Sequence, residues 1–262
     1  MRVRERKETE TVLREGARVT QVTLTSDITV NHIQSVGDDL TICRAAWQSS
    51  TDIPPEEATE ARLFGLLRSL IRHRHGSPLE AGFLTVAVHA PLFVLAQWVR
   101  HRHTSISIDD LSYSVESGRY RELAPVFWVP RPDRPILKAS PWNPMRPQFE
   151  RLDSGDRAAL DWMLEECYGR IWEAYRRMLA MGIAPEVARS VLPQSTYCHW
   201  WASGNLRSWL SFLSLRTKDA GADVVSHVQM ETEETGRAVE RLLGERWPLV
   251  MRAWRECGRG AV

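Results

Sequence analysis

A strand, a proline and a helix in direct succession constrain the fold more than any other feature of the sequence. Residues 83–88 (FLTVAV) are apolar and rich in β-branched side chains, which indicates a strand. The fixed φ and missing N–H of Pro91 suit the first turn of a helix, predicted here to continue to about Arg102. This order places Arg100, His101 and Arg102 at the C-terminal end of that helix.

Apolar spacing, capping residues and prolines predict the other regular elements. We expect a strand over residues 17–27, and helices from about Glu57 to His73, from Asp153 or Ser154 to about Met181, briefly from Pro185, over Asn205–Leu215 and over Asp223–Leu243. The serine-rich residues 103–120 are predicted to form a long polar loop. Residues 125–147 hold seven of the 14 prolines and are predicted to be an extended surface excursion. Residues 1–16 are expected to be a charged N-terminal extension, and residues 17–262 a single domain.

The charge balance excludes a protein that holds nucleic acid or a membrane through its overall field, because 34 basic residues face 33 acidic ones. Only three of the basic residues are lysines, so an anion site would be local and built from arginine. The four cysteines form no C-x-x-C pair, which argues against a disulfide framework and a structural zinc site. Residues 1–16 lack the apolar segment of a signal peptide, and no stretch has the length and apolarity of a membrane span. We therefore expect a soluble cytoplasmic protein.

Two runs of alternating arginine and histidine, residues 72–75 and 100–103, are candidate binding sites. Histidine pairs can ligate a metal, but the guanidinium groups between them repel a cation, and neither run has a nearby carboxylate or thiolate. We therefore predict no metal. Arginine and imidazole together suit a phosphate or a developing negative charge. A solvated helix end, whose cations complement the helix dipole, is the alternative.

A third cluster, Ser117-Gly118-Arg119-Tyr120, offers a hydroxyl, an unobstructed backbone N–H and a guanidinium, which together can hold a phosphate. Arg189, Arg207 and Arg216 lie in apolar surroundings, so each needs either an anionic ligand or an internal ion pair. The sequence contains no nucleophile elbow, Walker loop or Rossmann glycine motif. A hydrolase triad, P-loop chemistry and a Rossmann dinucleotide fold therefore have no support.

The order of these motifs resembles the flavin-dependent thymidylate synthase family. The matching pieces are HGSPLE at 75–80, the segment 83–102 with its RHR signature, SGRY at 117–120, APEVARSVLP at 184–193 and NLRSWLSFLSLR at 205–216. The resemblance runs from about Val22 to Trp254. It implies an α/β (α+β) fold with a central antiparallel sheet flanked by helices, and a homotetramer whose active sites lie between subunits. It also implies methylation of a uridylate, UMP or dUMP, at C5, with methylenetetrahydrofolate as carbon donor and NADPH-reduced FAD as hydride source.

The matching motifs carry the family's site residues onto this chain. The expected flavin-binding residues are His75, Ser77, Glu80, His101, Arg102, Asn205, Arg207 and Ser211. The expected substrate-binding residues are Gln97, Arg100, Glu116, Ser117, Gly118, Arg119, Arg189 and Arg216, of which Arg100 and Arg216 are the catalytic pair. The resemblance implies that Ser117, Gly118, Arg119 and Arg189 hold the phosphate. It implies that Arg216 faces the uracil edge and stabilises charge developing on the ring.

The chain departs from the family pattern where ribose, phosphate and flavin meet. Residues 103–116 form a longer connection than is usual, and either Glu116 or Asp110 matches the family's acidic residue near the ribose. Ser211 stands where the family usually has Asn, and Ala220 where a flavin-contacting His is common. These departures motivate the hypothesis that the enzyme accepts UMP, with its 2′-hydroxyl, as in the family's branch that serves nucleoside-antibiotic biosynthesis. A dUMP-only thymidylate synthase is the first alternative.

Two alternatives of other classes are weighed against this interpretation. A non-catalytic flavin- or nucleotide-binding homologue would keep the fold without turnover, but the retained RHR signature argues against it. An RNA-binding module using the arginine–histidine runs would show steeply salt-dependent RNA binding and no flavin absorption. We therefore expect no nucleic-acid or membrane partner.

Overall fold

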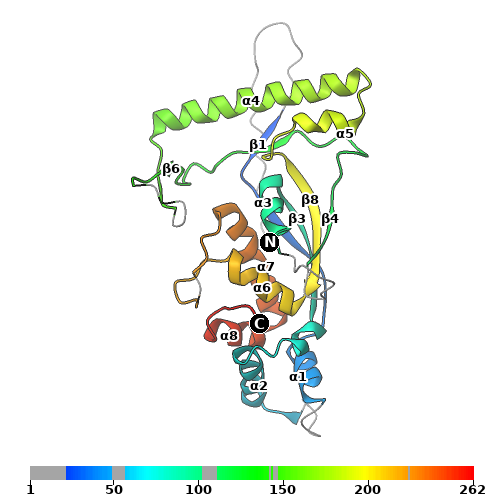
Figure 1. The fold of residues 1–262 in the computed structure, drawn as a ribbon, viewed down its shortest axis with the longest axis vertical. Helices are drawn as coiled ribbons and strands as arrows, with labels where there is room; N and C mark the ends of the chain where they lie inside the picture. The colour runs from blue at the N-terminus through cyan, green and yellow to red at the C-terminus, as the bar shows by residue number, and fades with distance from the viewer. Residues whose placement is uncertain (1–21, 49–56, 102–110, 142, 144–146, 224) are drawn as a thin grey trace. The chain divides into compact units, whose positions relative to one another are not determined.

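The computed structural model describes residues 22–48, 57–101, 111–141, 143, 147–223 and 225–262. They form two compact units, which are described separately (Figure 1). The smaller unit contains the described parts of residues 22–27, 91–93 and 116–198, and the larger contains those of 28–90, 94–115 and 199–262. Because the chain passes between the units repeatedly, they are not consecutive sequence domains. The prediction of a single domain over 17–262 stays a prediction.

A four-stranded sheet forms the framework of the larger unit. Its strands, in spatial order, are β2 (Thr29–Val36), β3 (Phe83–Pro91), β8 (Tyr197–Asn205) and β4 (Ser112–Val115) (Figure 1). The outer pairs, β2 with β3 and β4 with β8, are antiparallel. Between the central strands, Thr85 hydrogen-bonds Ser203 and the His89 ring stacks on His199, a reversed order that marks β3 and β8 as antiparallel too. The expected antiparallel sheet is therefore confirmed.

Aromatic side chains from three helices form the core over one face of this sheet. The helices are α3 (Leu92–Trp98), α6 (Leu206–Arg216) and α7 (Met230–Arg246). The buried Trp98 ring lies 5.6 Å from Trp200 of β8 and 4.6 Å from Phe212 of α6, measured between centroids. Its indole N–H donates to Thr235 Oγ1 of α7 over 2.9 Å, so one side chain ties α3, α6, α7 and the sheet together.

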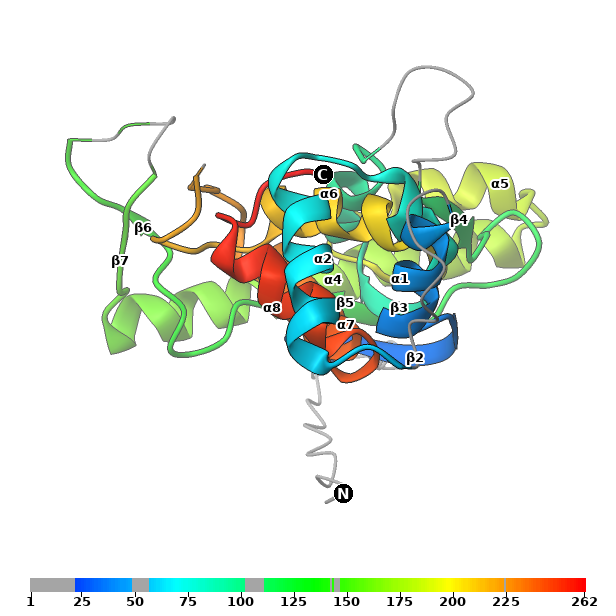
Figure 2. The same cartoon turned by 90° about the horizontal axis from the view of Figure 1, so that it is seen from below.

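Three further helices pack against one another in the same unit. They are α1 (Asp39–Trp47), α2 (Glu60–Arg72) and α8 (Pro248–Glu256), and α2 lies beside both others (Figure 2). The carboxylate of Asp39 accepts the backbone N–H groups of Leu249 and Val250, each over 3.0 Å, which satisfies the first turn of α8. Burial raises the pKa of the Asp39 carboxyl above its ordinary value, although these two hydrogen bonds act in the opposite direction.

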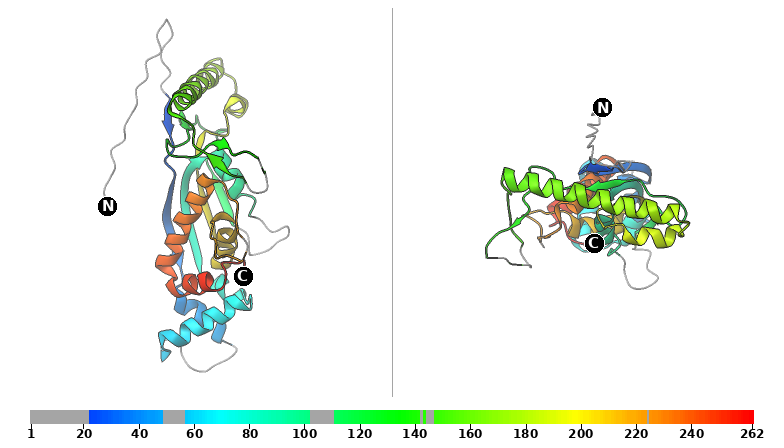
Figure 3. Two further views of the ribbon diagram at one scale, coloured as in Figure 1. Left: turned by 90° about the vertical axis from the view of Figure 1, so that its left-hand side faces the viewer. Right: turned by 90° about the horizontal axis from the view of Figure 1, so that it is seen from above.

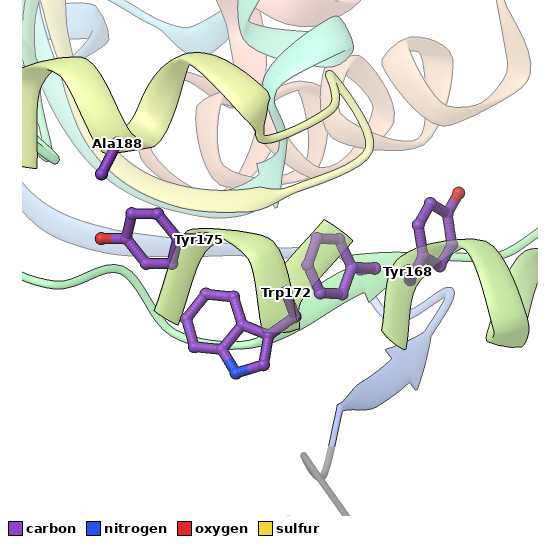
Figure 4. Packing of buried hydrophobic residues seen from close by; sticks show 5 residues of the cluster. Tyr168, Trp172, Tyr175 and Ala188 are labelled. Atoms are coloured by element: carbon purple, nitrogen blue, oxygen red, sulfur yellow. The ribbon is translucent and has the colours of Figure 1, made fainter. Parts of the chain in front are cut away.

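The smaller unit is built on one long helix, α4 (Ser154–Ala180), with α5 (Pro185–Ala188) and the 3₁₀ turn η3 (Arg189–Val191) beside it (Figure 3). Its strands are the parallel pair β1 (Thr23–Thr25) and β5 (Val126–Trp128) and the antiparallel pair β6 (Leu137–Lys138) and β7 (Phe149–Glu150). The core is aromatic: Tyr168, Trp172 and Tyr175 of α4 pack with Phe127 and Ala188 (Figure 4). The Tyr168 ring stacks on Phe127 at 4.9 Å.

The helix predictions are largely confirmed, but some elements differ. The helix after Pro91 ends at Trp98, so Arg100 and His101 follow the helix. The strand expected over 17–27 covers only Thr23–Thr25 among the described residues. The last helix predicted from Asp223 begins at Met230 and continues to Arg246. The loop expected over 103–120 contains strand β4. No helix among the described residues is long and apolar enough to span a membrane.

Candidate active site

The first turn of α6 holds two of the expected flavin-binding residues. Asn205 is the N-cap: its buried Oδ1 accepts the Ser208 backbone N–H over 2.8 Å and the Ser208 hydroxyl over 2.9 Å. Arg207, half-buried, donates from Nη1 to Glu80 Oε1 and from Nε to the backbone oxygen of Val262, both over 2.9 Å. The sequence left an anionic ligand or an internal ion pair open for Arg207, and the structure contains an internal ion pair with Glu80.

Glycine lets the 75–80 segment approach Arg207 closely. A Cβ on Gly76 would come within 2.5 Å of Arg207 Nε, so a larger residue there would displace the guanidinium. The segment continues into the 3₁₀ turn η2 (Ser77–Ala81), which carries Glu80. His75 and Ser77 are exposed on either side of this glycine. The structure thus brings His75, Ser77, Glu80 and Arg207 together.

Two further expected flavin residues, His101 and Ser211, lie just after α3 and on α6. The His101 ring contacts Phe212 of α6 at 4.9 Å, and the His101 backbone N–H donates to the Trp98 carbonyl. Ser211 is half-buried on α6. Arg100 is exposed just after α3. Arg102 and Asp110 lie outside the described residues.

Gln97 of α3 and Arg216 of α6 line one pocket of about 500 Å³ in the larger unit. Arg216 Nη2 donates to the Gln97 backbone oxygen over 3.0 Å, while Nε is buried and has no hydrogen-bond partner among the described residues. Within those residues no carboxylate forms an ion pair with Arg216, so the internal ion pair weighed from the sequence is not found. Burial lowers the pKa of the Arg216 guanidinium, because desolvation disfavours its charged form. A buried donor without a partner is costly, so this geometry suits a ligand acceptor in the pocket.

The expected phosphate-binding residues come together in the smaller unit. Gly118 is buried, and a Cβ on it would lie 3.0 Å from Leu123 Cδ1 and 3.3 Å from Arg189 Cδ, so the glycine backbone lies against the Arg189 stem. The Ser117 hydroxyl accepts the Arg119 backbone N–H over 3.3 Å. Arg189 is exposed and forms no ion pair with another described residue. Two guanidinium-bearing residues, a hydroxyl and a backbone turn are the donor set of an anion site.

Two carboxylates accompany this cluster. Arg119 Nε donates to Glu186 Oε2 over 3.1 Å at an exposed position, an interaction that solvent weakens. Glu116, one of the two acidic residues considered for the ribose, accepts a hydrogen bond from Arg121 and has a nearly buried side chain. A contact between Glu116 and the ribose stays a prediction.

Sequence reasoning missed the other residues that line this pocket. They are Leu215 and residues 225–229, including Ser226, His227 and Gln229. The segment was predicted to be helical from Asp223, but the helix begins at Met230, and residues 225–229 belong to no helix or strand. The only sequence signal was polar residues spaced among valines, which does not distinguish a loop from a helix face.

Similar proteins of known function identify the family of this chain. The chain matches the family model described as "Thymidylate synthase complementing protein" over residues 31–249. It therefore belongs to the flavin-dependent thymidylate synthase family and is an enzyme of the methyltransferase type.

Individual relatives are similar over almost the whole chain. The flavin-dependent thymidylate synthase of Streptomyces avermitilis is 36% identical over 239 residues, which cover 90% of this chain and 94% of that protein. That of Streptomyces coelicolor is 36% identical over 244 residues, covering 92% and 96%. The crystal structure of the UMP/dUMP methylase PolB from Streptomyces cacaoi bound with 5-Br UMP matches with a TM-score of 0.82 and 34% identity, covering 92% of this chain and 99% of that one. The same methylase bound with 5-Br dUMP matches equally well.

The residues around Arg207 suit a flavin. Two exposed donors, His75 and Ser77, flank a glycine that lies against a guanidinium, a set suited to an anionic pyrophosphate. Among the described residues no group of three His, Cys, Asp or Glu side chains could hold a metal ion. A flavin is therefore the cofactor that both the donor set and the family membership support.

Proposed function

We propose that this enzyme methylates C5 of a uridylate, UMP as well as dUMP, with methylenetetrahydrofolate as carbon donor and NADPH-reduced FAD as hydride source. The observation that carries the proposal is the buried Nε of Arg216, which lies beside Gln97 in the 500 Å³ pocket and has no hydrogen-bond partner among the described residues. Addition of a hydride, or of another nucleophile, to a pyrimidine ring places negative charge on its carbonyl oxygens. A preorganised guanidinium that has already lost water stabilises such charge more effectively than solvent does.

The substrate phosphate is assigned to the cluster of Ser117, Gly118, Arg119 and Arg189. Phosphate oxygens accept bidentate hydrogen bonds from arginine, and the exposed Arg119–Glu186 pair is weak enough to be replaced by a dianion. Ser117 has a binding role here and does not act as a nucleophile. Arg100 is assigned to the same nucleotide as a second cation near the reacting ring.

The flavin is assigned to His75, Ser77, Glu80, His101, Asn205, Arg207 and Ser211, with Arg102 as a further member. When bound, FAD supplies the hydride that completes the methyl group, and NADPH regenerates its reduced form. The protein's own contribution is to hold the anionic part of the cofactor with Arg207 and the histidines. Glu80 orients the Arg207 guanidinium through their 2.9 Å ion pair.

Two observations support UMP as a substrate besides dUMP. The connection formed by residues 103–116 is longer than is usual in the family. Because it directly precedes the phosphate cluster in sequence, it can contribute to the ribose site. A relative of 34% identity is a UMP/dUMP methylase whose structure has been solved with both 5-bromo nucleotides. A site that satisfies a 2′-hydroxyl can discriminate strongly in its favour. Specialised use of UMP would suit nucleoside-antibiotic biosynthesis, and the dUMP-only enzyme is the alternative.

A homotetramer is proposed as the functional assembly. Alternate residues of β3 and β8 are buried under helices, whereas Phe83 and Trp201 are 37% and 51% exposed on the opposite face of the sheet. Large exposed aromatic residues on one face of a sheet support an interface with another copy of the chain.

The proposal is tested by release of the C5 hydrogen from labelled dUMP and UMP. We expect release only when FAD, NADPH and methylenetetrahydrofolate are all present, with a 5-methyl nucleotide as product. Release without folate, or a product lacking the methyl group, would contradict the proposed reaction. Bound flavin without turnover would favour the non-catalytic homologue.

A further inference from the structure

Three side chains form a hydrogen-bonded relay that ends at the nucleotide pocket. Gln97 Nε2 donates to Gln229 Oε1 over 2.6 Å, and Gln229 Nε2 donates to Glu231 Oε2 over 2.9 Å. Gln97 and Gln229 both line the pocket, whereas Glu231 is 5% exposed at the start of α7. Of these three residues, the resemblance assigns a role only to Gln97.

The buried carboxylate fixes the direction of the whole relay. An ionised carboxylate can only accept hydrogen bonds, so the amide of Gln229 must turn its Nε2 toward Glu231. Its Oε1 then faces Gln97 and can only accept, which requires Gln97 to present Nε2. Rotating either amide by 180° would oppose two oxygens or two N–H groups inside a partly buried site, at the cost of an unmade hydrogen bond. Oε1 is therefore the amide atom of Gln97 that the relay leaves for a ligand.

The pocket thus offers an acceptor beside a donor. Arg216 has only donors, and its Nε is buried without a partner among the described residues. The uracil edge presents the complementary pattern, a carbonyl oxygen at C4 and an N–H at N3. Cytosine presents the reverse, an amino group at C4 and an unprotonated N3.

We infer that Gln229 and Glu231 are positioning residues that lock the amide of Gln97 so that the pocket accepts uracil and rejects cytosine. This inference rests on the proposed function, because it names the base that the same pocket recognises. If the Gln97 amide were reversed, its Nε2 would face the N3–H of uracil, and two donors would be opposed. A mismatched buried pair of this kind discriminates strongly between the two bases. Neither relay residue needs to touch the nucleotide.

The test compares UMP and CMP binding to the flavin-loaded enzyme by calorimetry, with CMP measured by competition. Gln229→Leu removes the relay at similar size. Glu231→Gln keeps the shape but allows the relay to reverse, since an amide can donate or accept. Gln48→Leu is the control, because Gln48 is exposed after α1 and does not line the pocket.

We expect the ratio of UMP to CMP affinity to fall about tenfold in Gln229→Leu, the scale of one lost hydrogen bond, and by less in Glu231→Gln. The control should keep the wild-type ratio. A general loss of structure would weaken both nucleotides together, so the ratio isolates the positioning role.

Each outcome decides between the two proposals. If Gln229→Leu binds UMP and keeps the wild-type ratio of UMP to CMP affinity, the positioning role of the relay is contradicted while the methylase proposal stands. If that variant binds neither nucleotide, the same ratio measured in Glu231→Gln decides: a wild-type ratio contradicts the positioning role. If the wild-type enzyme binds neither UMP nor dUMP, the proposed function fails, and the inference fails with it.

Discussion

Arg216 donates from Nη2 to the backbone oxygen of Gln97 over 3.0 Å, which leaves its buried Nε at the pocket with no partner among the described residues. One hydrogen bond thus holds the guanidinium in position, and its Nε–H donor stays available to a ligand. A donor held in this way needs no reorganisation when charge develops on a ligand, which is the condition for electrostatic catalysis. The arrangement therefore predicts an effect on turnover more than on ground-state binding.

Replacing Arg216 by Ala should lower kcat on the order of a hundredfold, as for loss of a single preorganised donor, and weaken nucleotide binding much less. Steady-state kinetics together with calorimetric binding separates the two effects. Arg241→Ala on the exposed face of α7 is the matched control and should leave both values unchanged. An equal loss in affinity and no loss in kcat would assign Arg216 to binding alone.

Arg119→Ala and Arg189→Ala should each weaken binding of the nucleotide by about 1.5–3 kcal/mol, the scale of hydrogen bonds to a charged group. Binding of the uridine nucleoside, which lacks the phosphate, should change little in either variant. Arg170→Ala, an exposed arginine of α4 paired with Glu166, serves as the control. Unchanged nucleotide affinity in both site variants would remove the phosphate assignment.

Gly118→Ala tests the close approach of the 117–119 turn to Arg189. The new Cβ would lie 3.0 Å from Leu123 and 3.3 Å from Arg189, so those side chains must shift, at a cost of about 1 kcal/mol in stability. Displacing Arg189 should also reduce nucleotide affinity. Gly169→Ala in α4 meets no atom within 4 Å and should stabilise the helix by about 0.5–1 kcal/mol. Urea unfolding measures the stability of the two variants, and calorimetry measures their nucleotide affinity. Equal changes in Gly118→Ala and Gly169→Ala would contradict the close approach of Gly118 to Arg189.

The buried Glu240–Arg259 pair should make stability sensitive to acid. Arg259 donates to both Glu240 oxygens, over 3.1 and 2.8 Å. Burial alone would raise the pKa of Glu240, but the bonds and charges of Arg259 and Arg255 outweigh it and hold this pKa below the ordinary 4.5. The pair's contribution to unfolding free energy is therefore complete above pH 4.5 and is lost as pH falls from there through the lowered pKa.

Glu240→Gln is the variant that isolates this contribution. It should be less stable than wild type at neutral pH, because Arg259 then lacks a buried counter-ion. The difference between the two proteins should shrink below pH 4.5 in urea unfolding experiments. A difference that stays constant down to pH 3 would show that the carboxylate charge of Glu240 contributes nothing.

Local signals in the sequence predicted the helices well. Asn205 and Asp153 are capping residues in the structure, and the helices that follow them begin where expected. Strand β8 was not predicted because it carries large residues on both faces: Trp200 is buried and Trp201 exposed, which hides the two-residue period. Strand β4 was not predicted because its serines also suit a loop. Its antiparallel pairing with β8 stabilises it as a strand, although its composition does not favour one.

The candidate site was predictable only where motifs carry it. Gly118 and Arg189 were grouped by resemblance, since no local pattern relates residues so far apart in sequence. Gln229 had no such motif, and its place in the pocket depends on tertiary contacts with Gln97. Arg207 forms an internal ion pair with Glu80, one of the two alternatives left open by its sequence, whereas Arg216 forms none with a described residue. The composition around the two arginines did not distinguish these outcomes.

The most direct test of the account is release of the C5 hydrogen from UMP and from dUMP, measured side by side with FAD, NADPH and methylenetetrahydrofolate present. The account predicts folate-dependent release from both nucleotides, with 5-methyl-UMP identified by mass as the product from UMP. Release from dUMP alone would contradict the assignment of UMP as a substrate, and release from neither would contradict the methylase itself.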